Sequence, residues 1–249
     1  MVCPLTMRVL IVVPALNEES GLPPLLSELR AVAGRDGSSV EIVVIDDAST
    51  DRTADVARDH GARVVRLCRN LGIGGAVQTG LRLALREGFD CAVQMDGDGQ
   101  HPPSELGKLL AAIQSPNPPD IVVGSRYLQR EGFQSTLPRR VGSGWLGWVL
   151  GIVTGEKTTD PTSGYRVYGR RALRLFNWSY PHDYPEPEAL VLAKVAGLRV
   201  TEVPVTMKER QGGASSISVL HAPYYMLKVT AAILLAYARS WHRIEPRTL

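Results

Sequence analysis

Two carboxylates one residue apart mark the middle of the chain. Asp96 and Asp98, separated by Gly97, follow the apolar run 91–95, and Gln100 comes two residues later. On a continuing strand, residues two apart share a face, so both carboxylates would point the same way. Oxygen ligands at this spacing suit Mg²⁺ or Mn²⁺, which keep waters and also bind a substrate diphosphate. Glycine and aspartate also form ordinary turns, and the motif alone is equally consistent with one.

A second acidic stretch follows the apolar run 40–45, and its carboxylates are Asp46, Asp47 and Asp51. Acidic residues at such a strand end accept hydrogen bonds from a ribose or a nucleobase in dinucleotide-binding folds. Helix capping explains the same residues equally well, with Ser49 or Thr50 as the N-cap and Asp51 in the first turn.

A glycine-rich turn, Gly72-Ile-Gly74-Gly75, opens the next predicted helix. Backbone N–H groups at a helix start can bind phosphate, and glycines allow a nucleotide to approach closely. The stretch is neither a GxGxxG motif nor a P-loop, because no Gly-Lys-Ser/Thr follows. A plain turn is the alternative.

Alternating strands and helices must position these motifs. The predicted strands are 8–13, 40–45, 62–67, 91–95 and 120–124, and the predicted helices are about 22–33, 53–60, 72–86 and 103–113. This alternation indicates βαβ units and an α/β fold with a mainly parallel sheet. In such sheets ligands bind at the carboxyl ends of the strands, where the motifs lie.

The second half of the chain is less regular. It contains an apolar segment, a short strand, a helix, an edge-type strand interrupted by Pro204, a Gly/Ser-rich loop and a long apolar helix, at 139–154, 164–168, 185–196, 199–207, 208–218 and 219–241. We therefore expect one large domain over residues 1–218, followed by an apolar helix and tail over residues 219–249.

Composition excludes several classes of protein. The 249 residues are 44% apolar and 21% charged, which is typical of a globular domain with its own core. A net charge of +3 without a basic, aromatic patch argues against nucleic acid. Cys3, Cys68 and Cys91 are scattered, which argues against a zinc site or disulfides and fits a reducing compartment. The first residues lack a signal-peptide pattern.

The order of five motifs along the chain resembles the family 2 glycosyltransferases with the GT-A fold. It is most similar to their polyprenyl-phosphate branch, the dolichyl-phosphate mannose synthase-like enzymes. The similarity covers residues 8 to about 218. The motifs are Pro14-Ala-Leu-Asn-Glu-Glu, Asp46-Asp-x-Ser-x-Asp, Asn70-x-Gly-x-Gly, Asp96-x-Asp-x-Gln-His-Pro-Pro and Gly124-Ser-Arg-Tyr.

This resemblance implies roles for the matching residues. A first set would line the nucleotide pocket: Pro14, Asn17, Glu18, Asp47 and Gly74. A second set would hold Mg²⁺ or Mn²⁺ on the diphosphate of the sugar donor: Asp96, Asp98 and Gln100. The donor base and sugar stay open among GDP-mannose, UDP-glucose and UDP-N-acetylglucosamine.

The resemblance also implies an acceptor side. Arg126 would face the phosphate of a polyprenyl acceptor, together with Arg139 and Ser143, which match an Arg-x-x-x-Ser pattern. Arg210 matches a loop arginine that closes over the donor phosphates, although that loop here ends in Ser-Ser and lacks the usual lysine. The segment Pro185-Glu-Pro-Glu also departs from the mannose-synthase pattern and slightly favours a UDP-sugar.

The predicted chemistry is a single displacement with inversion. A phosphate acceptor is already ionised at neutral pH, so no dedicated base is needed, and a metal and arginines stabilise the leaving diphosphate. Arginine forks bind phosphate in a bidentate manner. Transfer to a sugar hydroxyl is the alternative, with Glu186 or Glu188 as the base. A non-catalytic sugar-nucleotide scaffold is the other alternative.

Two apolar stretches predict a peripheral location on the cytoplasmic face of a membrane. Trp145 and Trp148 would share one helical face, with arginines nearby, as interfacial helices do. A buried core helix is the alternative. The cleanest run of the last helix, 229–238, is too short to cross a bilayer. That helix would lie at the interface or dock a small integral-membrane partner.

Overall fold

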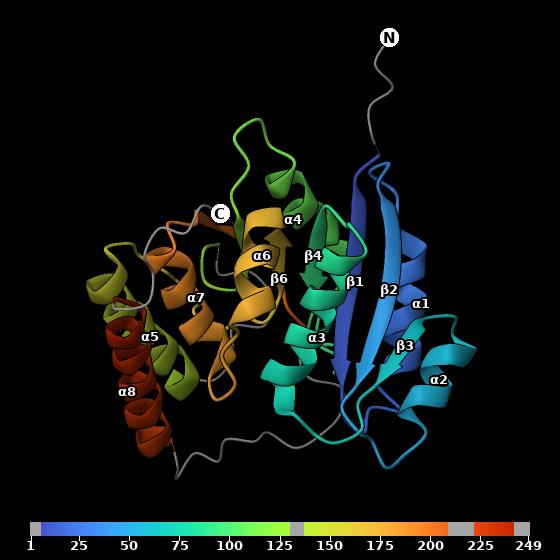
Figure 1. The fold of residues 1–249 in the computed structure, drawn as a ribbon, viewed down its shortest axis with the longest axis horizontal. Coiled ribbons are helices and arrows are strands. Elements are labelled where there is room, and N and C mark those ends of the chain that lie inside the picture. The colour runs from blue at the N-terminus through green and yellow to red at the C-terminus, as the bar shows by residue number, and fades with distance from the viewer. Residues whose placement is uncertain (1–5, 130–136, 209–221, 242–249) are drawn as a thin grey trace.

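The computed structural model describes residues 6–129, 137–208 and 222–241. Within them a seven-stranded sheet has the order β3-β2-β1-β4-β6-β5-β7 (Figure 1). The strands are β1 (Arg8–Ala15), β2 (Ser39–Asp46), β3 (Arg63–Arg66), β4 (Cys91–Gln94), β5 (Ile121–Ser125), β6 (Arg166–Gly169) and β7 (Val200–Pro204). The helices are α1 (Leu22–Val32), α2 (Thr53–Asp59), α3 (Gly72–Arg86), η1 (Pro103–Glu105), α4 (Leu106–Ile113), α5 (Leu137–Thr154), α6 (Arg170–Trp178), α7 (Pro185–Val195) and α8 (Ala222–Trp241).

Strand β1 lies inside the sheet, and its side chains fill two separate cores. Leu10 and Val12 face one core, whereas Val9, Ile11 and Val13 face the other. A strand covered on both faces needs apolar side chains at every position, which explains its unbroken apolar run.

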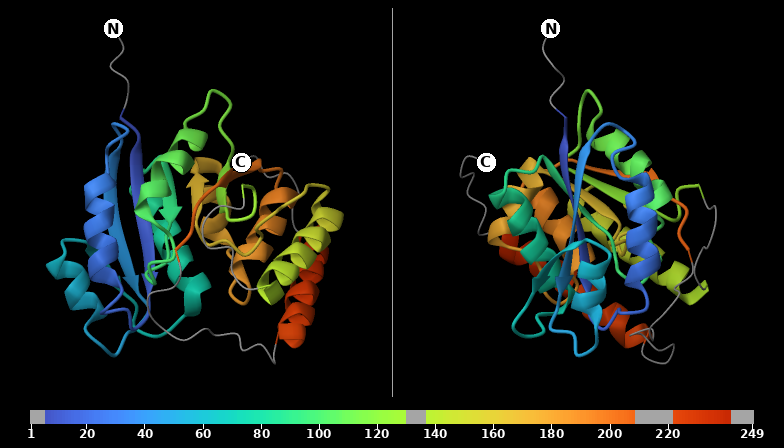
Figure 2. Two further views of the ribbon diagram at one scale, coloured as in Figure 1. Left: turned by 180° about the vertical axis from the view of Figure 1, so that it is seen from behind. Right: turned by 90° about the vertical axis from the view of Figure 1, so that its right-hand side faces the viewer.

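Helices cover both faces of the sheet (Figures 1 and 2). Residues of α3, α5, α6, α7 and α8 pack in one core, and residues of α1 and α4 pack in the other. The result is a three-layer α/β arrangement, as the alternation of elements predicted.

One strand of the sheet runs against the others. β6 is antiparallel to both of its neighbours, β4 and β5, and Gln94 lies opposite Arg166 in the register. The remaining neighbouring strands pair in parallel. The amino end of β6 therefore lies beside the carboxyl end of β4, where the acidic motif begins.

Most predicted elements are confirmed, but three details differ. Helix α6 was not predicted, and β7 ends at Pro204 rather than continuing to residue 207. The proposed capping of α2 by Ser49 or Thr50 is wrong, because the N-cap is Arg52. Asp51 instead accepts a hydrogen bond from the Thr53 N–H at 2.9 Å. The predicted domain boundary at residue 218 lies outside the described residues.

Gly80 allows α3 to lie directly on β1. A Cβ at this position would overlap Cγ1 of Val12. We expect Gly80→Ala to lower the free energy of unfolding by about 1–3 kcal/mol, because a packed core does not absorb an added methyl group. Gly107→Ala in α4 is the matched control, since nothing lies within 4 Å of its Cβ. It should be neutral or stabilising by about 0.5–1 kcal/mol. Urea denaturation of both variants measures the difference, and equal stabilities would contradict the close contact.

Candidate active site

The acidic motif forms a turn at the carboxyl end of β4. Asp98 is 5% exposed, and its Oδ1 accepts a hydrogen bond from the Gln100 N–H at 3.0 Å. The side chain of Asp96 is 32% exposed and is therefore the more accessible of the two carboxylates. The backbone oxygen of Gln100 accepts a hydrogen bond from the Lys208 N–H at 3.0 Å, which ties the turn to the segment that follows β7.

The buried side chain of His101 holds the backbone of this turn in place. Its Nδ1 accepts a hydrogen bond from the Asp96 N–H at 3.0 Å, so the ring proton lies on Nε2, which is 3.8 Å from Oδ2 of Asp96. The ring is 4% exposed and stacks on Tyr165 with centroids 5.0 Å apart. The sequence motif contains this histidine, but its spacing did not reveal a supporting role.

Gly164, just before β6, leaves space next to the Asp96 carboxylate. A Cβ at this position would lie 3.0 and 3.3 Å from the two oxygens of Asp96 and 3.2 Å from Nε2 of Gln94. A side chain at this position would therefore crowd the accessible carboxylate of Asp96.

These residues fit a divalent cation that arrives with its substrate. Among the residues that the structure describes, no group of three or more His, Cys, Asp or Glu side chains is placed to hold a metal ion. Mg²⁺ and Mn²⁺ do not require such a group, because one or two carboxylates, waters and phosphate oxygens complete their coordination. Asp96 and Asp98 supply that number of carboxylates, with Gln100 in the same turn.

The loop after β1 is joined to the loop after β2. Asn17 has φ of 56°, and its Oδ1 accepts a hydrogen bond from the Thr50 N–H at 2.9 Å. Its own N–H donates to Ser49 Oγ at 2.9 Å. The Glu18 N–H donates to Thr53 Oγ1 at 2.8 Å. The structure therefore brings two of the predicted nucleotide-side motifs together at one edge. Pro14 is buried within β1, immediately before this loop.

Asp47 and Gly74 both have a structural reason for their identity. The Asp47 carboxylate accepts hydrogen bonds from the N–H groups of Leu71 and Gly72, at 2.7 and 2.9 Å, and thereby fixes the start of α3. A Cβ at Gly74 would overlap the carbonyl oxygen of Pro181. These local contacts explain both residues, and their predicted place in the nucleotide pocket stays a prediction.

Arg126, directly after β5, makes a bidentate ion pair with Asp160. Its Nε and Nη2 each lie 2.7 Å from an oxygen of the fully buried Asp160 carboxylate. Burial opposes the charge of Arg126, but the hydrogen bonds to Asp160 and the negative charges nearby, that of Asp160 above all, together outweigh it and raise the pKa of the guanidinium. The side chain is 18% exposed, so its orientation is set by the protein before any ligand binds.

Two more charged side chains hold the loop that carries Asp160. The Glu202 carboxylate accepts a hydrogen bond from the Asp160 N–H at 2.9 Å. Arg166 is fully buried and donates to the carbonyl oxygens of Ser163 and Pro161 at 2.7 and 3.0 Å. Sequence reasoning missed all three of these charged residues. The available signal was an arginine inside a short strand that was otherwise expected to be apolar.

The two glutamates at the start of α7 differ in their surroundings. Oε1 of Glu188 accepts a hydrogen bond from the Tyr184 N–H at 3.1 Å and so caps the helix. The pKa of Glu186 is raised by loss of solvation, and the negative charge of Asp96 raises it further, whereas Arg166 opposes the shift. Of these two glutamates, Glu186 is the one whose pKa responds to the charge of Asp96.

The acceptor-side residues are only partly described. Ser143 is 4% exposed and lies in α5. The backbone of Arg139 lies in the same helix, but its side chain falls outside the described part, and Arg210 lies outside the described residues altogether. The predicted roles of Arg139 and Arg210 therefore stay predictions.

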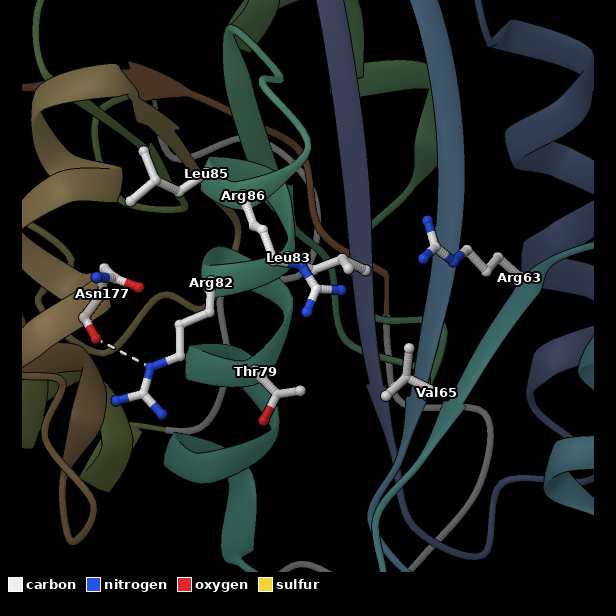
Figure 3. Close-up of a pocket in the computed structure, with 8 residues that line it drawn as sticks. All are labelled: Arg63, Val65, Thr79, Arg82, Leu83, Leu85, Arg86 and Asn177. Atoms are coloured by element: carbon white, nitrogen blue, oxygen red, sulfur yellow. Dashed lines mark hydrogen bonds between the residues drawn. The ribbon is translucent and has the colours of Figure 1, made fainter.

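A cavity of about 660 Å³ lies elsewhere, between α3 and β3 (Figure 3). Its lining residues are Arg63, Val65, Thr79, Arg82, Leu83, Leu85, Arg86 and Asn177. Arg82 Nε donates across it to the Asn177 carbonyl at 2.9 Å. None of the site residues predicted from the sequence lines this cavity, so it is separate from the acidic turn.

Known proteins resemble this chain in sequence and in structure. Residues 10–176 match glycosyl transferase family 2. The undecaprenyl-phosphate mannosyltransferase of Micrococcus luteus is 34% identical over 222 residues, which are 85% of this chain and 88% of that protein. The polyprenol monophosphomannose synthase of Mycolicibacterium smegmatis is 31% identical over 234 residues, with 90% and 86% covered.

Among solved structures, the glucosyl-3-phosphoglycerate synthase of Mycobacterium tuberculosis in complex with Mn²⁺, UDP-glucose and phosphoglyceric acid has a TM-score of 0.69. It shares 20% sequence identity, and the match covers 93% of this chain and 80% of that chain. At this identity the match establishes the GT-A fold that the order of motifs predicted. Since the family match spans residues 10–176, from β1 into α6, and includes the acidic turn, the chain belongs to glycosyl transferase family 2.

Proposed function

We propose that this glycosyltransferase moves a hexose from a nucleotide-diphosphate sugar to a polyprenyl phosphate at a membrane surface, with inversion at the anomeric carbon. The observation that carries the proposal is that two carboxylates and one arginine lie at the same edge of the sheet, where the parallel strands end. The Asp96–Asp98 turn follows β4, and Arg126, whose pKa responds to the charge of Asp96, follows β5. The names of the two curated relatives support the polyprenyl acceptor.

On the donor side, Asp96 and Asp98 would hold Mg²⁺ or Mn²⁺, with Gln100 as a third ligand. The bound ion would neutralise charge on the leaving nucleoside diphosphate. The Mn²⁺ and UDP-glucose in the solved structural relative support a divalent ion and a nucleotide sugar. Pro14, Asn17, Glu18, Asp47 and Gly74 would form the nucleotide side, because their loops are hydrogen-bonded together at the same edge.

On the acceptor side, Arg126 would orient the phosphate, assisted by Arg139 and Ser143 on α5 and by Arg210. Asp160 accepts hydrogen bonds from two nitrogens of Arg126. This pairing fixes the orientation of the guanidinium before the acceptor phosphate binds. A positioned arginine stabilises the charged transition state at no reorganisation cost. A phosphate oxygen is already a nucleophile at neutral pH, so these residues need to align it rather than to remove a proton.

The test is transfer of labelled sugar in the presence of Mn²⁺. Thermal-shift screening of GDP-mannose, UDP-glucose and UDP-N-acetylglucosamine selects the donor, because a ligand that binds the folded state raises its apparent stability. The selected donor is then incubated with polyprenyl phosphate. We expect a sugar lipid that extracts into chloroform and is lost with EDTA. The absence of such a product with every donor would refute the proposal.

Transfer to a sugar hydroxyl is a second candidate, favoured by the raised pKa of Glu186 beside Asp96. If Glu186 acted as a general base, Glu186→Gln would slow transfer by about 10²–10⁴-fold. We expect a change of less than about tenfold, because a phosphate acceptor needs no such base. Initial rates with saturating donor measure the effect, and a loss in the larger range would favour the hydroxyl acceptor.

A further inference from the structure

The cavity between α3 and β3 combines positive charge with an apolar wall (Figure 3). Among the described residues that line it, three are arginines and none is acidic. Val65, Leu83 and Leu85 form the apolar part of the lining. Its volume of about 660 Å³ lies within the range of roughly 300–1,000 Å³ that is usual for small-molecule sites. The size and the lining together fit a small anion that has an apolar part.

Arg82 is held through its Nε, which leaves its two terminal nitrogens for a ligand. Nε donates a hydrogen bond to the Asn177 carbonyl oxygen at 2.9 Å. Within the part of the chain that the structure describes, Nη1 and Nη2 of Arg82 make no hydrogen bond or ion pair. Two N–H groups of a guanidinium match two oxygens of a phosphate or carboxylate. The contact with Asn177 therefore orients this side chain before an anion binds.

Arg86 follows Arg82 by one helical turn and lies on the same side of α3. Like charges at this spacing repel each other and destabilise a helix. The sequence of α3, Gly72–Arg86, contains no aspartate or glutamate that would offset them. Glu87 lies 3.8 Å from Nη2 of Arg86, which is too far for a hydrogen bond. An anion that contacted both arginines would remove the repulsion.

Arg63 borders the cavity from β3, but its charge is already balanced. Its Nη1 and Nη2 donate to the two carboxylate oxygens of Glu87 at 2.7 and 2.8 Å, and Nη1 also donates to Glu41 at 3.2 Å. In the view of Figure 3, the guanidinium groups of Arg63 and Arg86 point toward each other. Arg63 thus forms a fixed wall, and the positive charge left for a ligand comes from α3.

The rim of the cavity faces water. All three of its arginines are exposed. Among the residues that the structure describes, no helix is long and apolar enough to cross a bilayer. The exposed tryptophans Trp145 and Trp148 lie on α5, which contributes no residue to the cavity lining. A charged rim of this kind favours a water-soluble anion over a lipid.

We propose that this cavity binds a small organic phosphate, with the phosphate on Arg82 and Arg86 and the organic part against Val65, Leu83 and Leu85. A phosphate monoester carries a charge of about −1.5 to −2 at neutral pH, which matches two guanidinium groups. A single carboxylate would balance only one of them. The site is separate from sugar transfer, because none of the residues assigned to the donor, the metal or the acceptor lines it.

Methyl NMR of the full chain tests this site without any catalytic readout. The probe is 1-naphthyl phosphate, titrated in EDTA without nucleotide sugar or polyprenyl phosphate. We expect the methyl signals of Val65, Leu83 and Leu85 to shift with one dissociation constant. Arg82→Gln/Arg86→Gln should raise that constant at least about tenfold, because charge-assisted contacts to the phosphate are lost.

Arg58→Gln on α2 is the matched control for this experiment. Arg58 is also an exposed arginine, pairs with Asp55 at 2.9 Å and lies outside the cavity lining. Its dissociation constant should equal that of the unmodified protein. Arg86→Gln alone removes no hydrogen bond within the described residues and should give part of the effect, even if the double variant failed to fold.

Three results would overturn the proposal. The first is that the three methyl signals stay unchanged at millimolar probe. The second is an equal dissociation constant for the arginine variants and the control, since binding would then not use these side chains. The third is tighter binding of a hexaglutamate peptide than of the probe at the same methyl groups, which would make the cavity a docking site for an acidic protein segment.

Discussion

Replacing Asp98 by asparagine is expected to lower the rate of sugar transfer on the order of a thousandfold while the protein stays folded. The substitution removes one negative charge from the acidic turn but keeps an oxygen that can accept the Gln100 N–H. Loss of one preorganised group that stabilises charge in a transition state costs about 10²–10³-fold, and here the metal also loses a ligand. Initial rates at saturating donor and Mn²⁺ measure the effect.

Asp90→Asn is the matched control for this prediction. Asp90 directly precedes β4, at the opposite edge of the sheet, and accepts a hydrogen bond from the Arg8 N–H at 2.8 Å. We expect it to leave the rate unchanged. A normal rate for Asp98→Asn, with stability equal to that of the control, would remove Asp98 from the proposed metal site.

Removing Arg126 should have the second largest effect, on both stability and acceptor use. Arg126→Met leaves the fully buried Asp160 carboxylate without its cation, which costs about 3–5 kcal/mol of unfolding free energy for a buried pair. Urea denaturation measures this loss. The KM for polyprenyl phosphate should rise at least about tenfold, because one charge-assisted phosphate contact disappears. The KM for the donor should change less.

A double variant separates the two roles of this arginine. In Arg126→Met/Asp160→Asn the buried charge is gone, so most of the lost stability should return. The high KM for the acceptor should remain. If acceptor use recovered together with stability, Arg126 would be only a structural partner of Asp160, and its predicted contact with the acceptor phosphate would be wrong.

The sequence predicted the residues at the carboxyl ends of the strands better than the contacts that hold the neighbouring loops in place. Apolar runs followed by Asn17, Asp47 and Asp96 are local patterns, and each marks a strand end without knowledge of the partner strands. The order of these motifs then identified the family before any geometry was available. The predicted neighbourhood of Asn17 and the acidic loop after β2 is present in the structure as hydrogen bonds.

The remaining features depend on contacts between distant residues. The pairing of Arg126 with Asp160 and the hydrogen bond from the Asp160 N–H to Glu202 join residues 34 and 42 positions apart, which come together only when β5, β6 and β7 form one sheet. No local pattern indicates this arrangement, since a short strand carries no mark of its direction. Helix α6 was missed because it is only nine residues long and three of them are arginines, so its buried residues Ala172, Leu173 and Phe176 form too short a pattern to mark a helix.

The reversed direction of β6 has a practical consequence for engineering. If all the strands were parallel, only the loops that follow a strand would lie at the edge that carries the acidic turn. Because β6 is antiparallel to its neighbours, the loop that precedes it, residues 155–165, also lies at this edge and places Asp160 and Gly164 there. That connection joins α5 to β6 and is bonded to the neighbouring strands, since the Tyr165 carbonyl oxygen accepts a hydrogen bond from the Gly124 N–H of β5 and the Asp160 N–H donates to Glu202 of β7. An exchange of this connection between relatives therefore has to keep Asp160 together with Arg126 and Glu202.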